Sequence, residues 1–384
     1  MAHRDHRDDA QAGRLNDRIL SRRALNRALL ARQLLLRRAE LGVAPALEHL
    51  VGLQAQATLP PYIGLWSRLE AFDPDELGRM LTNGKAVRLT LMRGTVHLVT
   101  SRDAQVLRPL VQEVIERSHS GAFGRRMGAA DPQQLSRAVA ELLALEPLGA
   151  RELGRRLVAK GIGDDAEAIG NAARVYVPLV QLPPRGVWGA SGRALYATLE
   201  AWTGRPLHKR PALDGVVRRY LGAFGPASVL DMQRWSGLTK LKEPFERLRP
   251  QLAVFHDEQG RELFDLPGAP RPDPGTPAPV RFLGEYDNVL LGHADRRRVI
   301  PADFPSDAML APRRFVNNLL VCGMLRATWW LERDGKRRAV LAIRPFRKLS
   351  KRDHAAVTAE AWRLLDFAAD EAAARDVRVE EAVG

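Results

Sequence analysis

Apolar residues in the first 100 positions recur at helical spacing and later alternate as in strands. Leu25, Leu29 and Leu36 belong to a basic amphipathic segment, and Asp73-Pro74 starts a later helix with proline in its first turn. Two β-rich runs meet at Arg93-Gly94, which predicts a hairpin. The predicted helices cover 21–39, 44–53, 62–69 and 75–81, and the predicted strands cover 87–92 and 95–99.

The same order of helices followed by a hairpin recurs twice. Asp131-Pro132 opens a helix of the second copy, and Gly225-Pro226 precedes a helix–turn–helix in the third. Helix–turn–helix plus hairpin is the pattern of a winged helix. The second copy predicts helices over 101–118, 132–145, 149–157 and 167–179 and a loose hairpin over 182–196. The third predicts helices over 213–224, 229–235 and 240–248 and a hairpin of 252–255 with 262–266.

A stretch rich in proline and glycine, 267–279, marks a linker, after which strand patterns dominate. Asp334-Gly335 between two of these strands is a strong two-residue hairpin signal. A long helix over about 351–374, with a solvated acidic tail, is expected to end the chain. The strand-like segments are 280–283, 289–291, 298–300, 328–333 and 338–344.

These patterns predict an α+β fold in which three tandem winged helices precede a small C-terminal β-rich, barrel-like domain. The length agrees, because 384 residues are enough for two to four domains. The predicted parts are a disordered N-terminus over 1–14, winged helices over 15–100, 101–204 and 205–266, a linker over 267–279, and the β-rich domain over 280–384.

The charge of the chain indicates a polyanionic partner. Lys and Arg number 59 against 45 Asp and Glu, which gives a net charge of +14. Such a balance favours nucleic acid first and an acidic membrane surface second. An arginine-rich proteome would produce the same balance without any contact, so this alternative stays open. No run approaches the ~20 apolar residues of a membrane-spanning helix, and the polar N-terminus lacks the apolar core of a secretory signal.

Cys322 is the only cysteine, so neither an internal disulfide nor a thiolate metal cage can form, and a reducing cytoplasm fits best. Its apolar neighbours predict a buried, inert thiol. The chain has no H-E-x-x-H motif, P-loop, dinucleotide fingerprint or nucleophile elbow. We therefore expect neither a metal nor a cofactor.

Gln54 and Gln56 form the most informative polar motif, in the run Gly52-Leu53-Gln54-Ala55-Gln56. Side chains at i and i+2 of an extended backbone project to the same side. Their amides offer acceptors and donors but do not titrate, so the pair can hold a water or a polar substrate without an acid–base step. Taken alone, the motif also fits a helix end that runs into a polar loop.

Two further polar segments are candidates for DNA contact. Arg93, Thr95 and His97 can share one face of the first wing, with a structural histidine as the alternative. The run 285–300 predicts two strands around a polar turn, whose tip can enter a DNA groove. A solvated turn with a local Asp–Arg pair is the alternative. The polar residues of this turn are His293, Asp295, Arg296, Arg297 and Arg298.

Together these segments resemble the AlkZ-type winged-helix DNA glycosylases, the family that also contains the YcaQ-like cross-link-repair enzymes. The resemblance extends from about residue 15 to about residue 367. The motifs that carry it are Gly52-Leu53-Gln54-Ala55-Gln56, Arg93-Gly94-Thr95-Val96-His97-Leu98-Val99, Phe282-Leu283-Gly284-Glu285-Tyr286-Asp287-Asn288, His293-Ala294-Asp295-Arg296 and Ile343-Arg344-Pro345-Phe346.

The resemblance implies a fold that holds duplex DNA in a basic concave channel. It also implies hydrolysis of the N-glycosidic bond of N7-alkylated purines, including the unhooking of interstrand cross-links. Gln54 and Gln56 then correspond to the catalytic pair that positions the attacking water. The YcaQ-like branch has an aspartate in the second position, so two glutamines favour the AlkZ-like branch.

The motif has no neighbouring lysine that would form a Schiff base, so we expect a monofunctional glycosylase. We expect a monomer that acts on duplex DNA containing alkylated bases, in the cytoplasm and associated with the nucleoid. Two other functions stay open. Three basic winged helices alone would suit a transcription regulator, and a catalytically silent paralogue would bind alkylated DNA without releasing the base.

Overall fold

The computed structural model describes residues 19–123, 126, 130–302, 304 and 317–382. The chain divides into two compact units. Unit 1 contains the chain up to Ala39, Tyr220–Asp231 and the chain from Lys242 onward, and unit 2 contains Glu40–Arg219 and Met232–Leu241. The N-terminus that was expected to be disordered, 1–14, lies outside the described residues.

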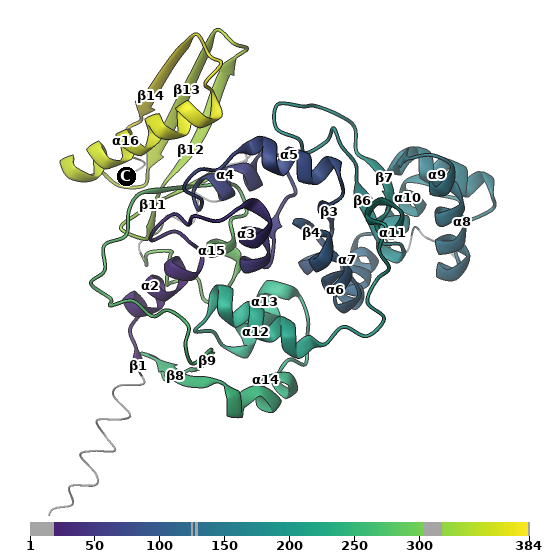
Figure 1. Ribbon diagram of the computed structural model, residues 1–384, viewed down its shortest axis with the longest axis horizontal. Coiled ribbons are helices and arrows are strands. Elements are labelled where there is room, and N and C mark those ends of the chain that lie inside the picture. Colours follow the sequence, from purple (N-terminus) through teal and green to yellow (C-terminus); the bar gives the residue numbers. More distant parts are fainter. Residues whose placement is uncertain (1–18, 124–125, 127–129, 303, 305–316, 383–384) are drawn as a thin grey trace, which may run out of the picture. The chain divides into compact units, whose positions relative to one another are not determined.

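Unit 2 is built around one six-stranded sheet with the order β2–β4–β3–β6–β7–β5 (Figure 1). β3 and β4 form the hairpin that Arg93-Gly94 predicts, and Leu89 of β3 pairs with Val180 of β6. This pairing joins the first two predicted hairpins in one sheet. The strands are β2 (Leu53–Gln54), β3 (Ala86–Thr90), β4 (Val96–Thr100), β5 (Leu148–Gly149), β6 (Leu179–Gln181) and β7 (Leu195–Thr198).

The helices of unit 2 begin where the sequence provides caps. Asp73 and Asp131 each accept hydrogen bonds from backbone N–H groups of the following turn, and a proline follows each of them. The helix before the glutamines ends at His49, earlier than predicted. The helices are α3 (Val43–His49), α4 (Pro60–Trp66), α5 (Pro74–Thr82), α6 (Ser101–Leu110), α7 (Gln112–Phe123), α8 (Pro132–Leu145), α9 (Ala150–Ala159), α10 (Ala166–Tyr176) and α11 (Leu199–Thr203), with a 3-10 turn, η1 (Met92–Gly94).

Helices α9 and α10 cross at two glycines. A Cβ atom at Gly154 would lie 1.8 Å from the Ala166 carbonyl oxygen, and one at Gly170 would lie 2.2 Å from the Ala150 carbonyl oxygen. Only glycine allows this approach, which closes a core that α8 also covers.

Unit 1 contains an open five-stranded sheet, β10–β11–β12–β13–β14, and a three-stranded sheet, β1–β8–β9. Helix α16 lies along the larger sheet (Figure 1) and begins at Ser350, whose side chain accepts the Asp353 N–H. The Asp334-Gly335 hairpin between β12 and β13 is confirmed.

The strands are β1 (Ile19–Leu20), β8 (Ala253–Asp257), β9 (Glu262–Asp265), β10 (Arg281–Leu283), β11 (Asn317–Val321), β12 (Met324–Asp334), β13 (Arg338–Pro345) and β14 (Ala374–Val379). The helices of unit 1 are α2 (Arg22–Arg32), α14 (Lys242–Leu248), α15 (Asn288–Leu291) and α16 (Lys351–Ala368), with a 3-10 turn, η3 (Arg249–Gln251). Two more, α12 (Leu213–Phe224) and α13 (Val229–Ser236), contribute residues to both units.

Three predictions for unit 1 are wrong. The expected strands 289–291 and 298–300 are a short helix, α15, and a turn. The last helix ends at Ala368 and does not end the chain, because β14 follows it and pairs in parallel with β13. Most side chains of β14 are nevertheless exposed, as expected for the tail. Cys322 is exposed because it sits with Gly323 in the tight turn between β11 and β12, where both residues have positive φ.

The fold is therefore a mixture of helices and sheets, as predicted. Its division into three winged helices and a separate β-rich domain stays a prediction.

Candidate functional site

The Gln54 segment is placed by a sharp turn after α3. Val51 and Gly52 both have positive φ, 55° and 86°. A Cβ atom at residue 52 would lie 2.5 Å from Cγ1 of Val99, so the turn needs glycine. The chain then runs antiparallel to β4, with Gln54 opposite His97.

The backbone pairing changes just past Gln54. The Ala55 N–H still donates to the Val96 carbonyl at 2.7 Å, but the Val96 N–H donates to Oε1 of Gln56 at 3.2 Å. The Ala55 carbonyl accepts Nη2 of Arg88 at 2.8 Å instead. The Gln56 side chain thus takes the place of a backbone acceptor at the end of the strand.

Arg93 holds the first glutamine. Its Nη2 donates to Oε1 of Gln54 at 2.6 Å, and its Nη1 donates to the Trp235 carbonyl. The exposed fraction of Gln54 is only 8%, whereas Gln56 is exposed. Burial, together with the charge of Arg234, lowers the pKa of Arg93 to about 10, so the guanidinium stays charged at neutral pH. We call Gln54, Gln56, Arg93 and His97 the glutamine cluster.

His97 and Thr95 make internal hydrogen bonds. Nδ1 of His97 lies 3.0 Å from the Thr95 carbonyl, and the Thr95 hydroxyl donates to the Met92 carbonyl at 3.1 Å. Burial, and then the charge of Arg93, lowers the pKa of His97 to about 3, so its imidazole is neutral at physiological pH. Arg93 lies in the 3-10 turn η1 and β4 starts at Val96, so the predicted common strand face of residues 93, 95 and 97 is not formed.

Two residues of the segment that was predicted as a groove-entering hairpin are buried. His293 is buried, and its Nε2 lies 3.0 Å from the Phe224 carbonyl. Buried Arg298 donates from Nη1 to the Pro226 carbonyl at 3.1 Å. Burial, and then the charge of Arg298, lowers the pKa of His293 to about 3. Neither side chain is presented at the surface of unit 1.

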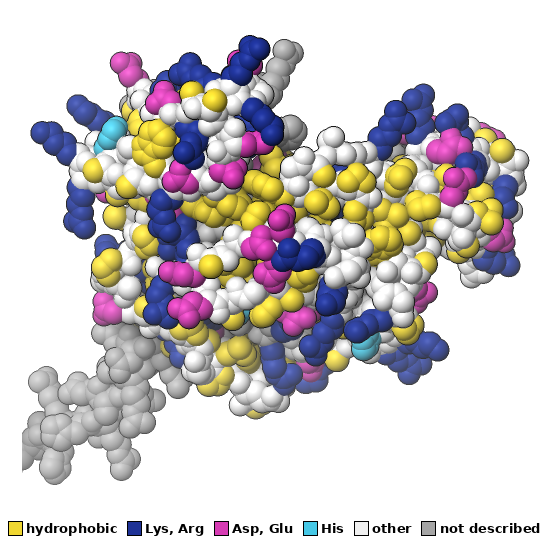
Figure 2. Space-filling view, turned by 45° about the horizontal axis from the view of Figure 1, so that its top comes forward, with side chains coloured by type: hydrophobic (Ala, Val, Ile, Leu, Met, Phe, Trp, Pro, Cys, Tyr) yellow, Lys and Arg dark blue, Asp and Glu magenta, His cyan; other side chains and the backbone are white. Residues whose placement is uncertain are grey.

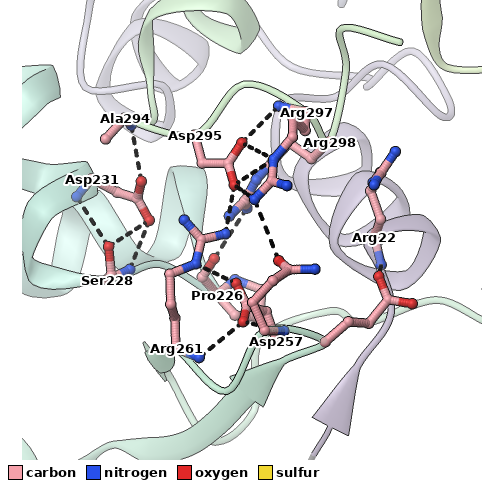
Figure 3. Close-up of polar contacts among 12 residues, drawn as sticks. Arg22, Pro226, Ser228, Asp231, Asp257, Arg261, Ala294, Asp295, Arg297 and Arg298 are labelled. Carbon is pink, nitrogen blue, oxygen red and sulfur yellow. Dashed lines mark hydrogen bonds and ion pairs between the residues drawn. The ribbon is translucent and has the colours of Figure 1, made fainter. Parts of the chain in front are cut away.

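Asp231 ties this segment to the start of α13 (Figure 3). Its carboxylate accepts the Ser228 N–H at 2.8 Å and the Ala294 N–H at 2.9 Å. We call Asp231, His293, Asp295 and Arg298 the aspartate cluster.

Asp295 lies beside Arg297 and Arg261 (Figure 3). It accepts Arg297 at 2.7 Å and Arg261 at 2.5 Å. The hydrogen bond from Arg297 is the main reason why the pKa of Asp295 lies below its ordinary value. Of the predicted DNA contacts in this segment, Arg296 and Arg297 are exposed.

One face of the molecule carries a mixed surface charge. On the face that Figure 2 shows, Lys and Arg side chains are interspersed with Asp and Glu side chains. Among the described residues, no group of three or more His, Cys, Asp and Glu side chains is arranged to hold a metal ion. No helix in the described part of the chain is long and apolar enough to cross a membrane.

The comparison with known protein families identifies the family to which this chain belongs. The profile of the family "DNA glycosylase AlkZ-like" matches residues 47–367, which is most of the chain and includes the whole glutamine cluster. The chain belongs to the AlkZ-like DNA glycosylase family. Members of this family are hydrolases of N-glycosyl bonds in DNA, so the protein is an enzyme.

Two matches support the assignment to the AlkZ-like family. An interstrand DNA cross-link repair glycosylase of Streptomyces sahachiroi is 28% identical over 297 residues, which cover 71% of this chain and 77% of the relative. The solved structure of the DNA glycosylase AlkZ from the same organism matches with a TM-score of 0.74 and covers 94% of this chain and 100% of its own. The sequences of that structural match are 22% identical, so it shows that the AlkZ fold is shared.

The sequence analysis missed two residues that make hydrogen bonds around the glutamine cluster. Arg88 stands in the otherwise apolar run Val87-Arg88-Leu89, and an arginine in such a strand is a signal for a buried polar contact. Trp235 contributes its backbone carbonyl, which no sequence pattern predicts.

Proposed function

We propose that the chain is a monofunctional glycosylase for N7-alkylated purines in duplex DNA, including purines joined in an interstrand cross-link. The paired amides of Gln54 and Gln56 carry this proposal, because an uncharged pair suits a leaving group that is already cationic. The relative that is named as a cross-link repair glycosylase supports the inclusion of cross-links.

The proposed chemistry needs little acid–base help. The water oxygen bonds to C1′ as the C1′–N9 bond breaks, and both electrons of that bond neutralise the charge of the alkylpurine. The water loses a proton to solvent. Gln54 and Gln56 orient the water, and positioning of this kind is worth up to ~7–11 kcal/mol of the barrier.

We propose that the exposed arginines Arg296 and Arg297 contact phosphates, and that the enzyme acts as a monomer. Phosphate contacts would add sequence-independent affinity, as a repair enzyme requires. Four of the predicted DNA contacts make hydrogen bonds inside the protein instead: Thr95, His97, His293 and Arg298. We propose that they hold the DNA-contacting segments in place without touching DNA themselves.

The test is excision from a duplex that carries one N7-methylguanine, read as an alkali-labile strand break. We expect the wild type to release the base, and the Gln54→Ala/Gln56→Ala variant to lose at least about 100-fold in rate, a modest part of what positioning can supply. Gln133→Ala is the matched control, because this glutamine is exposed on α8.

The outcome also separates the rival functions. Tight binding of the damaged duplex without base release would indicate a silent damage-binding paralogue. Enrichment of one sequence from a random pool of undamaged duplexes would indicate a regulator, and both results would overturn the proposal.

A further inference from the structure

The backbone fixes Arg93 in an uncommon conformation. Its φ is 56°, and Gly94 follows with a φ of 71°. A non-glycine residue in the left-handed region is uncommon and persists where its surroundings determine it. A Cβ atom at Gly94 would lie 2.7 Å from Oγ of Ser118, and one at Gly237 would lie 3.4 Å from Cα of Arg93. Close packing on both sides therefore fixes the backbone of Arg93 and, with it, the direction in which its side chain leaves the backbone.

The guanidinium determines which way the Gln54 amide faces. A guanidinium only donates hydrogen bonds, so the atom 2.6 Å from its Nη2 has to be the amide oxygen, Oε1. The amide nitrogen of Gln54 is then turned away from Arg93. The same argument applies to Gln56, because the Val96 N–H is also only a donor. Within the described part of the chain, neither amide nitrogen has a hydrogen-bond partner.

We propose that Arg93 is a positioning residue: it holds the oxygen of Gln54 so that the amide N–H group faces the ligand, and Gln54 meets that ligand as a hydrogen-bond donor. This inference rests on the proposed glycosylase function. The ligand atom opposite Gln54 is then an acceptor, and the oxygen of the attacking water meets that requirement. A lone pair of that oxygen accepts the amide N–H while the other points to C1′.

This role differs from the DNA contact that the sequence predicts for Arg93, which for an arginine would most simply be a contact with a phosphate. An arginine that binds a phosphate presents its fork to solvent before DNA arrives. Here one arm is bonded to Gln54 and the other to the carbonyl of Trp235. Arg234, on the same helix as Trp235, is exposed and is available for comparison.

The first test replaces Arg93→Lys in the full-length protein and measures single-turnover excision of N7-methylguanine with enzyme in excess. A lysine keeps the charge but is a point donor that cannot span two acceptors. We expect the rate at saturating enzyme to fall at least about 10-fold, with Kd for the damaged duplex within about 2-fold of the wild-type value. Arg234→Lys is the matched control and should keep the wild-type rate.

The second test replaces Gln54→Glu. A glutamate keeps the bond to Arg93, and so the fold, but has no N–H to donate. We expect it to be as inactive as Gln54→Ala, with an unchanged thermal unfolding midpoint. In the Gln54→Ala background, Arg93→Lys should cause no further loss, because the residue on which it acts is gone.

Three results would overturn the inference while the wild type stays active. Weaker binding by Arg93→Lys with an unchanged rate at saturating enzyme would make Arg93 a phosphate contact. Gln54→Glu retaining activity would show that Gln54 acts as an acceptor. Equal losses from Arg93→Lys with and without Gln54 would place its effect elsewhere. Absence of excision by the wild type would overturn the proposed function itself.

Discussion

The glutamine cluster and the aspartate cluster contain similar residues but differ in whether their polar groups are bonded within the protein. Each contains a buried histidine whose pKa is lowered to about 3, and an arginine that bonds a backbone carbonyl. In the aspartate cluster, the carboxylates of Asp231 and Asp295 accept hydrogen bonds from other groups of the protein. In the glutamine cluster, the donors of Gln54 and Gln56 face away from their protein partners.

This difference separates a contact that stabilises the fold from one that is available to a ligand. A buried polar group gains little by being satisfied but costs much when it is not. The aspartate cluster is therefore expected to respond to substitution through stability, and the glutamine cluster through rate.

The largest effect on stability should come from Asp231→Ala. This change leaves two backbone N–H groups without their acceptor and removes one of the two carboxylates, Asp231 and Asp295, whose charge favours the protonated form of Arg298. We expect the free energy of unfolding to fall by about 3–5 kcal/mol, as for other broken buried charge contacts. Urea unfolding followed by tryptophan fluorescence measures it.

The folded fraction of the same variant should excise N7-methylguanine at the wild-type rate. Loss of excision with unchanged stability would show that the aspartate cluster takes part in catalysis. Ser228→Ala, which removes only a capping hydroxyl, should cost about 1 kcal/mol.

A smaller effect should appear when the pH is lowered. The pKa of His97 and that of His293 are both about 3 in the folded protein and about 6.5 in the unfolded chain. The unfolded chain therefore binds protons that the folded chain does not, and stability falls as pH drops below about 6.5. Between pH 6.5 and 5 each histidine should cost roughly 2 kcal/mol.

Urea unfolding at the two pH values measures this loss, and His293→Gln should remove about half of it. An equal pH dependence in that variant would show that His293 already carries a proton in the folded protein.

The smallest effect on stability should come from Arg297→Gln. Half of this side chain is exposed and its partner Asp295 keeps Arg261, so the loss should be below about 1 kcal/mol. If Arg297 meets a phosphate, the slope of log K against log salt for duplex binding should decrease by about one. Arg375→Gln, which removes an exposed arginine paired with Asp366, is the control. An identical slope in both variants would remove Arg297 from the DNA surface.

The sequence was sufficient for elements that depend on neighbouring residues. Asp131-Pro132 predicts the start of α8, and Asp334-Gly335 predicts a hairpin, because caps and turns are local. The motif with Gln54 and Gln56 could also be found, since its family resemblance lies in consecutive residues.

The remaining features depend on contacts between distant residues. The segment 289–300 has apolar residues that suit a strand, but a buried His293 and Arg298 need carbonyls from Phe224 and Pro226. These partners lie about 70 positions earlier in the chain, so local patterns do not reveal them. The bond between Arg93 and Trp235 is hidden for the same reason.

The pairing of Leu89 with Val180 also limits how the chain can be divided. A fragment that stops at Thr100 would contain the complete glutamine motif but would leave one edge of β3 without its neighbour. An unpaired edge strand is a site for aggregation. A gene fusion or a minimal catalytic fragment would therefore have to keep the first two helix–hairpin segments together. Such a fragment would reach at least to Thr198, the end of β7.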